Sequence, residues 1–457
     1  MNLVPAISAR AKAAAIAGLA APLSPEAHLF ESGGGFHLLV ADGSQVFDLD
    51  RETYARLREA RATGALAAEL AALGLSRTRP AIDDAPPVAP TVRAISLAIA
   101  QKCNLGCVYC YARQGDFGGA PKNMPIETAR AAIDLLLRDA APGERARVAF
   151  LGGEPLTNRA AMRQATQYAA DEASRRGVAI AFSITTNGTL LAIEDAEFFE
   201  QHGFAVTVSL DGSRDAHNRL RPFRNGRGSY DVIVARAATL LARQRRMQVS
   251  ARVTVTPANL GLRETLEELI ALDFHSVGFS PTLHAPGGDG EMQPGDLEDM
   301  LADMITCGEE CERRAANGER YPFANLLTAI REIHKGAHKP YPCGAGAGYI
   351  GVSADGDLAA CHRFVGDAAG ALGSLAAGLD AERRAEWLAE RHVHRQSPCR
   401  ECWARYLCGG GCHHEVIHGG RAACDYIRGW LHYCLGAYVR LSTVRPDMFE
   451  GEWLTAH

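Results

Sequence analysis

The residues with the clearest chemical potential in this sequence are its cysteines. There are 13, and none precedes Cys103. The first three, Cys103, Cys107 and Cys110, follow a C-x-x-x-C-x-x-C spacing directly after an apolar segment. Three thiolates on one short loop can bind three irons of a four-iron cubane and leave the fourth iron open to another ligand. A structural zinc ion would need a fourth protein ligand, and none stands nearby in the sequence.

A second group of cysteines lies in the C-terminal part of the chain. Cys343 and Cys361 flank Gly356, and a C-x2-C-x5-C-x3-C run follows them. Such clustering in a reducing compartment indicates metal rather than a disulfide framework. Iron–sulfur clusters are one interpretation, and a zinc ribbon or knuckle is the other. The remaining cysteines of this group and the histidines beside them are Cys399, Cys402, Cys408, Cys412, Cys424, Cys434, His413, His414 and His418.

The composition is that of a folded protein with more than one domain. The chain has 457 residues, 47% hydrophobic and 22% charged, with a formal net charge of −5. This mild acidity argues against a nucleic-acid partner. No apolar run approaches the roughly 20 residues that cross a bilayer, and no secretory signal is recognisable, so we expect no membrane partner and a cytoplasmic location.

The elements that must position the cysteines follow from hydrophobic periodicity. The first 24 residues are Ala-rich and predicted to be helical. Alternating segments then predict a small antiparallel sheet, followed by two helices and a proline-marked linker. The predicted strands are 28–31, 36–40 and 45–49, and the predicted helices 53–60 and 64–73.

From residue 91 the pattern changes to alternating strands and helices. Short, strongly apolar strands with intervening helices predict an α/β fold with a parallel sheet, here a partial (β/α)6 barrel. We expect three further helices between Pro294 and Gly336. The predicted domains are 1–90, 91–336 and a Cys-rich unit at 337–457. The predicted strands are 94–100, 148–151, 180–185, 205–210, 251–256 and 277–280, and the helices 126–139, 159–176, 196–202, 230–245 and 262–272.

The first cysteine motif resembles the signature of the radical S-adenosylmethionine (SAM) superfamily, and other segments agree in order and place. Leu151–Pro155 reads LGGEP, Ile184–Gly188 reads ITTNG, and Ser209–Gly212 reads SLDG, each at the end of a predicted strand. The resemblance implies a [4Fe–4S] cluster whose open iron binds SAM, and a 5′-deoxyadenosyl radical that abstracts hydrogen. It also implies cofactor contacts from Tyr109, Gly152, Gly153, Glu154, Thr185, Thr186, Asn187, Ser209 and Arg221.

The second cysteine group resembles the SPASM extension, whose members carry two auxiliary [4Fe–4S] clusters. Three clusters in total are therefore implied. By this resemblance Cys343, Cys361 and Cys412 serve the nearer auxiliary cluster, with Cys434 as a fourth ligand or an iron left open to a substrate thiol. The outer cluster would use Cys399, Cys402, Cys408 and Cys424.

SPASM enzymes mostly modify ribosomally made peptides. The N-terminal module resembles leader-recognition elements, which add a peptide strand to a sheet edge, although a plain cap on the barrel is the alternative. The segment Pro342–Gly346 with Cys361–Gly366 and Leu372–Ser374 resembles the thioether-forming maturases, which include the maturation enzyme of quinohemoprotein amine dehydrogenase. We therefore expect Cys-to-carbon crosslinks, to a methylene of Asp or Glu, in a peptide or small-subunit protein.

Several alternatives stay open. They are a formylglycine-type maturase, a carbon–carbon cyclophane-forming maturase, and a non-catalytic, cluster-bearing peptide-binding scaffold. In the sulfatase-maturating enzymes a catalytic Asp follows the second SPASM cysteine, and here that position is His362. Asp211 and His362 are the candidate bases, and a flavodoxin- or ferredoxin-like protein is the expected electron donor.

Overall fold

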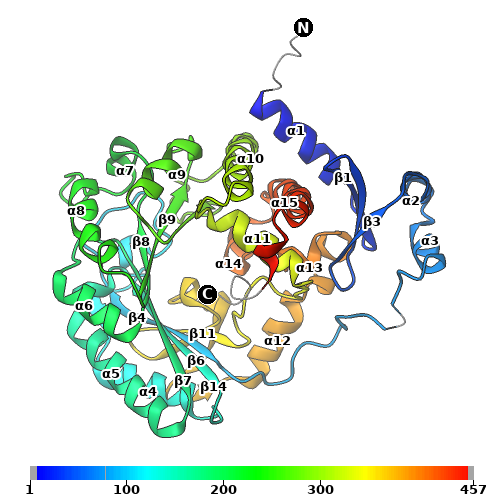
Figure 1. The fold of residues 1–457 in the computed structure, drawn as a ribbon. Coiled ribbons are helices and arrows are strands. Elements are labelled where there is room, and N and C mark those ends of the chain that lie inside the picture. The colour runs from blue at the N-terminus through cyan, green and yellow to red at the C-terminus, as the bar shows by residue number, and fades with distance from the viewer. Residues whose placement is uncertain (1–7, 78, 451–457) are drawn as a thin grey trace. The chain divides into compact units, whose positions relative to one another are not determined.

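The computed structural model describes residues 8–77 and 79–450, and Figure 1 shows its fold. The chain divides into two compact units. The barrel unit contains residues 86–292 and 344–389, and the terminal unit contains residues 1–85, 293–343 and 390–457. The division into three consecutive domains stays a prediction. No helix among the described residues is both long and apolar enough to cross a membrane.

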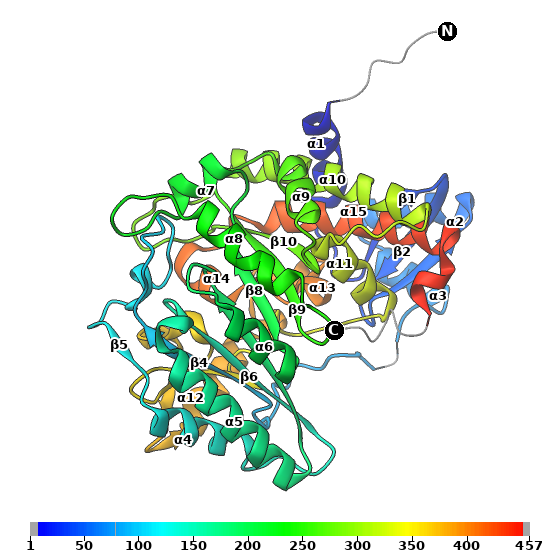
Figure 2. The ribbon, with the colours of Figure 1, turned by 60° about the vertical axis from the view of Figure 1, so that its left-hand side comes forward.

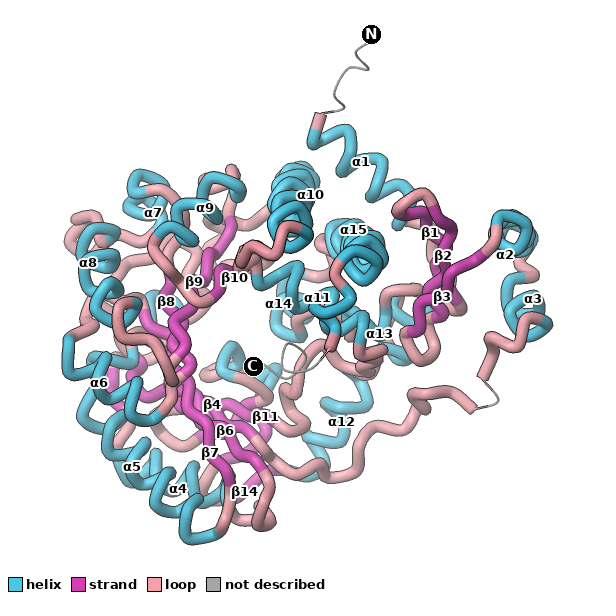
Figure 3. The backbone as a smooth tube through the Cα atoms, viewed as in Figure 1, coloured by secondary structure: helices cyan, strands magenta, loops and turns pink. Residues whose placement is uncertain are grey.

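The barrel unit is built on a curved sheet of parallel strands (Figure 3). The pairing order β10-β9-β8-β7-β6-β4 confirms the predicted six-strand α/β fold. Among the described residues β10 does not pair back onto the sheet, so the barrel is partial. These strands are β4 (Ala94–Gln101), β6 (Arg145–Gly152), β7 (Ala179–Thr186), β8 (Ala205–Ser209), β9 (Gln248–Val255) and β10 (Ser276–Pro281).

Helices between these strands cover the outer side of the sheet, as Figure 1 shows. Burial on both faces explains why β4 is an almost uninterrupted apolar run, with every residue after Ala94 buried. α5 matches its predicted bounds and ends at Gly177, whose φ of 67° suits a glycine C-cap. The helices are α4 (Ile126–Leu137), α5 (Arg159–Arg176), α6 (Ile193–His202), α7 (Arg214–Leu220), α8 (Tyr230–Leu241) and α9 (Leu262–Ala271).

The sheet continues past β4 through strands that the sequence did not predict. β11 (Tyr349–Val352) pairs parallel to β4, and antiparallel strands extend the sheet beyond it. These segments have two to four residues, too short for periodicity to reveal. They are β12 (Asp357–Ala359), β13 (Ala371–Ser374) and β14 (Gly378–Leu379); β5 (Lys122–Asn123) pairs with β4, and α12 spans Ala381–Arg391.

The N-terminal part of the terminal unit has the predicted strands and helices. The three strands form an antiparallel sheet in the order β1-β2-β3. Asp50 caps α2 by accepting a hydrogen bond from the Thr53 backbone N–H at 2.8 Å, as its place before the helix predicted. The expected N-terminal helix is α1, and residues 1–7 lie outside the described part. The elements are α1 (Ala9–Ala20), β1 (Ala27–Ser32), β2 (Gly35–Val40), β3 (Gln45–Leu49), α2 (Arg51–Thr63) and α3 (Leu66–Ala72).

Long helices dominate the rest of the terminal unit, and α10 (Pro294–Ala316) lies beside α15 (Cys424–Val444) in Figure 2. The expectation of three helices between residues 294 and 336 was wrong. The structure describes this whole range and has two, α10 and α11 (Ala324–His334), because the apolar positions of α10 continue over 23 residues. The Cys-rich unit also contains α15, a helix of 21 residues that the sequence analysis did not predict. Shorter helices are α13 (Arg405–Cys408) and α14 (His413–Gly419).

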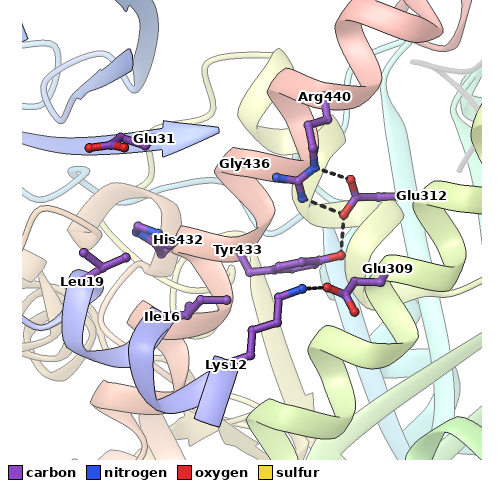
Figure 4. Close-up of a pocket in the computed structure, with 10 residues that line it drawn as sticks. All are labelled: Lys12, Ile16, Leu19, Glu31, Glu309, Glu312, His432, Tyr433, Gly436 and Arg440. Atoms are coloured by element: carbon purple, nitrogen blue, oxygen red, sulfur yellow. Dashed lines mark hydrogen bonds and ion pairs between the residues drawn. The ribbon is translucent and has the colours of Figure 1, made fainter. Parts of the chain in front are cut away.

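A network of charged side chains joins α1, α10 and α15 around a cavity of about 490 Å³ (Figure 4). Arg440 forms an ion pair with Glu312 through two contacts at 2.7 and 2.8 Å. Tyr433 donates to the same carboxylate at 2.5 Å, and Lys12 pairs with Glu309. Because these charges neutralise one another, the side chains around the cavity act as a packing contact between the helices.

Candidate functional site

The first cysteine loop leaves the carboxyl end of β4 and is held by the segment that follows α7. The backbone N–H of Gly106 donates to the Pro222 carbonyl at 2.8 Å, and that of Val108 donates to the Leu220 carbonyl at 3.1 Å. Leu105 forms a β-bridge with Phe223. Backbone hydrogen bonds therefore fix the path of residues 105–108, and the Leu105 N–H also donates to the Cys103 sulfur at 3.4 Å.

The end of β6 packs against this loop so closely that only glycine fits. A Cβ on Gly152, whose φ is 139°, would lie 2.2 Å from the Ala100 carbonyl oxygen. A Cβ on Gly153 would lie 2.3 Å from the Lys102 carbonyl oxygen. We expected these two glycines to let backbone approach a ligand. In the structure they let the β6 turn approach the chain that enters the cysteine loop.

The three cysteines are half-buried, and their thiols lie close enough to influence one another. Burial raises the pKa of Cys103 and Cys107 to about 11, and it also raises the pKa of Cys110. Arg221 acts in the opposite direction on the pKa of all three. Metal ligation requires the thiolate, so this buried guanidinium favours the state that binds iron.

Glu154 connects the end of β6 with the end of β7. Its carboxylate accepts from the Leu156 N–H at 3.0 Å, the Thr186 hydroxyl at 2.8 Å and the Asn187 N–H at 2.7 Å. Asn187 in turn donates through Nδ2 to the Asn104 side chain at 2.9 Å and to the Cys103 sulfur at 3.6 Å. The predicted residues Glu154, Thr186 and Asn187 thus lie together beside Cys103.

Arg221, Tyr109 and Asp211 form a second buried group beside the thiols. Arg221 donates to the Tyr109 hydroxyl at 2.6 Å and pairs with the Asp211 carboxylate at 3.7 Å. Tyr109 donates to Asp211, which also accepts from the Thr254 N–H at 2.9 Å. Burial raises the pKa of Asp211, and Arg221 opposes that shift. The Arg221 Nε is buried and has no hydrogen-bond partner among the described residues.

His217 is a positioning residue that the sequence analysis missed. Its Nδ1 accepts from the Asp211 N–H at 3.0 Å, and its Nε2 lies 3.0 Å from the Ser229 hydroxyl. Burial lowers the pKa of His217 to about 3, which keeps the ring neutral. Arg221 directly follows α7, and its backbone N–H donates to the His217 carbonyl at 2.7 Å, so the spacing of four residues between them was the available signal.

His362 lies beside Tyr111 and, in the described part of the chain, has no hydrogen bond in common with the Asp211 group. Its ring is 5.9 Å from that of Tyr111 in an edge-on arrangement, and its Nδ1 is 2.7 Å from the Tyr349 hydroxyl. Burial raises the pKa of Tyr111, and Cys110 and Cys361 add to that shift, so this tyrosine lies near a cysteine of each group. Burial lowers the pKa of His362 to about 4.

The structure places two other predicted residues without giving them a contact in the site. Thr185 is exposed near the end of β7 and pairs with Thr207. Ser209 is half-buried as the last residue of β8 and pairs with Arg252. Their roles toward a cofactor stay predictions.

In the terminal unit four cysteines lie together. The pKa of Cys399 is raised by burial and by Cys424 and Cys402, and burial with Cys399 and Cys402 raises the pKa of Cys408 to about 12. Four mutually close thiols form a complete ligand set for one cubane or one zinc ion.

The other predicted cysteine ligands do not all lie in one unit. Cys343 and Cys412 belong to the terminal unit, where Gly409 packs so tightly on Tyr341 and Pro342 that a Cβ would lie 2.4 Å from the Pro342 nitrogen. Cys361 belongs to the barrel unit. Cys434 is buried beside Glu312 and Arg440, ten residues or about 15 Å along α15 from Cys424.

The residues of the barrel site fit an iron–sulfur cluster with an anionic, amine-bearing ligand. Three adjacent thiols supply three iron ligands, and the orphaned Arg221 Nε is suited to a carboxylate. An ionised carboxylate accepts about four hydrogen bonds, so Glu154 has capacity for one donor beyond its three. An amino-acid moiety carries both of these groups.

Comparisons with known proteins agree with this chemistry. Residues 97–282 match the radical SAM superfamily. A serine-type anaerobic sulfatase-maturating enzyme of Klebsiella aerogenes is 25% identical over 352 residues, covering 72% of this chain and 82% of that enzyme. A protein of Methanocaldococcus jannaschii is 30% identical over 189 residues, which cover 41% of this chain and 62% of the relative.

Two solved structures share the fold. The structure of anSMEcpe with bound AdoMet and Kp18Cys peptide has a TM-score of 0.63 at 19% identity and covers 78% of this chain and 99% of its own. Streptococcus suis SuiB bound to precursor peptide SuiA has a TM-score of 0.50 at 15% identity and covers 86% of this chain and 96% of its own.

The two cysteine groups predict how iron content responds to mutation. Replacing Cys103, Cys107 and Cys110 together by Ala should remove about four irons per chain, and Cys402→Ala should remove a similar amount from the other group. Iron and sulfide assays on anaerobically reconstituted protein measure this. Cys307→Ala is the matched control, because Cys307 is a buried thiol of α10 outside both groups and should leave the iron content unchanged.

The buried Arg221 predicts unequal costs for its two partners. Asp211→Asn leaves the guanidinium buried without its anion and should lower the free energy of unfolding by about 3–5 kcal/mol. Tyr109→Phe removes one hydrogen bond while the ion pair stays, and should cost about 1 kcal/mol. Denaturant unfolding of the metal-free chain compares them. A Tyr109→Phe variant less stable than Asp211→Asn would contradict this account of the group.

Proposed function

Because residues 97–282 form a radical SAM domain, we propose that this protein is a radical SAM peptide maturase that installs thioether crosslinks. The observation that carries the proposal is the convergence of three thiols, Glu154, Asn187 and Arg221 at neighbouring strand ends. When bound, the cluster and SAM supply radical hydrogen abstraction from an unactivated carbon. The chain's own side chains supply cofactor binding and the base for the substrate thiol.

The barrel site would hold the cofactor through the residues already placed. Cys103, Cys107 and Cys110 are the proposed iron ligands. Glu154 is the proposed partner of the SAM ammonium, and Arg221 that of its carboxylate. Gly152, Gly153, Thr185, Thr186, Asn187, Ser209 and Tyr109 complete the proposed lining. Burial of Glu154 and Arg221 strengthens both interactions, since charge-assisted hydrogen bonds gain strength away from water.

Thioether formation also needs a base for the substrate thiol, and hydrogen bonding favours His362 over Asp211 for that role. Tyr349 donates to Ser96 Oγ at 2.8 Å, and Ser96 lies 3.5 Å from the Ile350 carbonyl oxygen, to which its hydroxyl donates. With the tyrosine hydroxyl donating to Ser96, we assign His362 Nδ1 as the donor to Tyr349, which leaves the basic lone pair on Nε2. Asp211 accepts from Tyr109 and Thr254 and is paired with Arg221, which suits an anchor.

A formylglycine-type activity is the second candidate, because the relative from Klebsiella aerogenes is a sulfatase-maturating enzyme. The substitution at the base position separates the two hypotheses. The resemblance places an aspartate after the second SPASM cysteine in that group of enzymes, and this chain has His362. Auxiliary clusters at the Cys-rich segment and a flavodoxin- or ferredoxin-like donor belong to either reaction.

The N-terminal module offers a place for the peptide. β3 ends the β1-β2-β3 order, so among the described residues its outer edge has no strand partner. A groove of about 470 Å³ runs along residues 43–47, opposite the end of α11. Arg77, His334, Lys335 and His338 line it, and no acidic side chain does. We propose that an acidic leader segment adds to the β3 edge, with backbone pairing for affinity and these cations for selection.

Co-expression with a candidate precursor peptide tests the reaction directly. Each thioether formed should lower the peptide mass by two hydrogens and remove one thiol from reaction with iodoacetamide. High-resolution mass spectrometry before and after alkylation reads both changes. A product that instead reacts with a hydrazide carries an aldehyde, which would favour formylglycine and contradict crosslinking.

Two variants separate chemistry from folding in that experiment. His362→Gln should lower crosslinking strongly while cofactor cleavage to 5′-deoxyadenosine continues, because only the base is lost. Asp367→Asn, an exchange in the same segment outside the base's hydrogen bonds, should keep crosslinking near the wild-type rate.

The groove along β3 predicts a charge-dependent affinity. Arg77→Glu should weaken binding of an acidic leader peptide by roughly fivefold, since an exposed ion pair contributes about 1 kcal/mol or less. Fluorescence anisotropy with a labelled leader measures it. Arg51→Glu is the control, because Arg51 is exposed on α2 of the same module and does not line the groove. Equal losses in both variants would argue for a non-specific charge effect.

A further inference from the structure

Two arginines contact sulfur atoms of the four-cysteine group in the terminal unit. Arg421 donates through Nη1 to the Cys399 sulfur at 3.0 Å and to the Gly410 carbonyl oxygen at 3.1 Å. Its other terminal nitrogen donates to the Gln396 side chain. Because the Gly410 and Gln396 contacts orient the guanidinium plane, the hydrogen bond to sulfur is a fixed feature of the site.

Arg428 approaches the same group from α15. Its side chain hydrogen-bonds to Cys402, and its guanidinium also donates to Asp425. Asp425 is 78% exposed, whereas the Arg428 side chain is only 11% exposed. The Arg428 Nε is buried and has no hydrogen-bond partner among the described residues. This N–H group beside Cys402 can donate a hydrogen bond to an anion larger than a single thiolate.

The positive charge is concentrated at this site. Arg391 lies near Arg421, so a third guanidinium stands close to one of the two that contact the cysteines. Gathering cations in a partly buried region is unfavourable unless negative charge lies among them. Four thiolates supply such charge, and a four-iron cluster held by them gains one further negative charge on reduction.

We infer that Arg421 and Arg428 are positioning residues that raise the reduction potential of the metal cluster held by Cys399, Cys402, Cys408 and Cys424, so that this site accepts the one electron released when a substrate carbon radical and a thiolate form the C–S bond. The inference rests on the proposed cluster at these cysteines. Hydrogen bonds to ligand sulfurs and nearby positive charge both stabilise the reduced, more negative state. All four thiols belong to one ligand set, which leaves the site a redox role rather than a substrate-binding one.

The test is a redox titration, followed by electron paramagnetic resonance, of the anaerobically reconstituted full chain and its variants. Arg421→Gln keeps a donor near Cys399 and removes the charge. It should make reduction about tenfold less favourable, which is about 59 mV for one electron, with iron content unchanged. Arg428→Gln carries the same expectation. Arg400→Gln is the matched control, since Arg400 lies between Cys399 and Cys402 in sequence, is 62% exposed and pairs with Glu401.

The outcomes separate this inference from the cluster assignment. An unchanged potential in either glutamine variant with full iron overturns the redox role. Loss of this site's iron from both glutamine variants, with retention in Arg421→Lys and Arg428→Lys, shows that the guanidiniums hold the metal rather than tune it, and also overturns that role. If Cys402→Ala removes no iron, or if zinc occupies the site, the cluster assignment itself fails.

Discussion

The barrel site depends on one buried guanidinium. Arg221 has little access to water, so its charge must be matched by a nearby anion, and the structure supplies the Asp211 carboxylate. Asp211 is fixed in turn by Tyr109, His217 and the backbone of β9. The same charge that requires this framework favours the thiolate state that iron needs. Stability and metal binding are therefore satisfied by one arrangement.

The tyrosines of the cysteine loop divide the site into two sides. Tyr109 reaches Asp211 and Arg221, whereas Tyr111 reaches His362. On the first side Tyr109 bonds to both Asp211 and Arg221, and the Arg221 Nε has no partner among the described residues. On the second side the His362 Nδ1 lies 2.7 Å from the Tyr349 hydroxyl, which donates to Ser96. This separation supports the proposal that structural and proton-transfer roles fall to different residues. In the terminal unit an arginine again lies near a cysteine. Arg421 donates to the Cys399 sulfur, and in the barrel unit Arg221 acts to lower the pKa of Cys103.

Much of this could be read from the sequence. The six parallel strands were predictable because burial on both faces makes them apolar runs, and the glycines and asparagine at strand ends carried local turn signals. β11 to β14 were not predictable, because segments as short as Gly378–Leu379 have no periodicity. α15 was missed because Cys, His and Gly interrupt its apolar pattern. Arg421 and Arg428 contact cysteines that are distant in the sequence, and spacing alone does not specify such contacts.

The most direct test of the account is cofactor cleavage at the barrel site. Anaerobically reconstituted protein is reduced, mixed with SAM, and assayed for 5′-deoxyadenosine and methionine by mass spectrometry, beside a Cys103→Ala variant. The account predicts both products in equal amounts from the wild-type chain and none above background from the variant. Intact SAM with a fully iron-loaded wild-type chain, or equal cleavage by the variant, would contradict it.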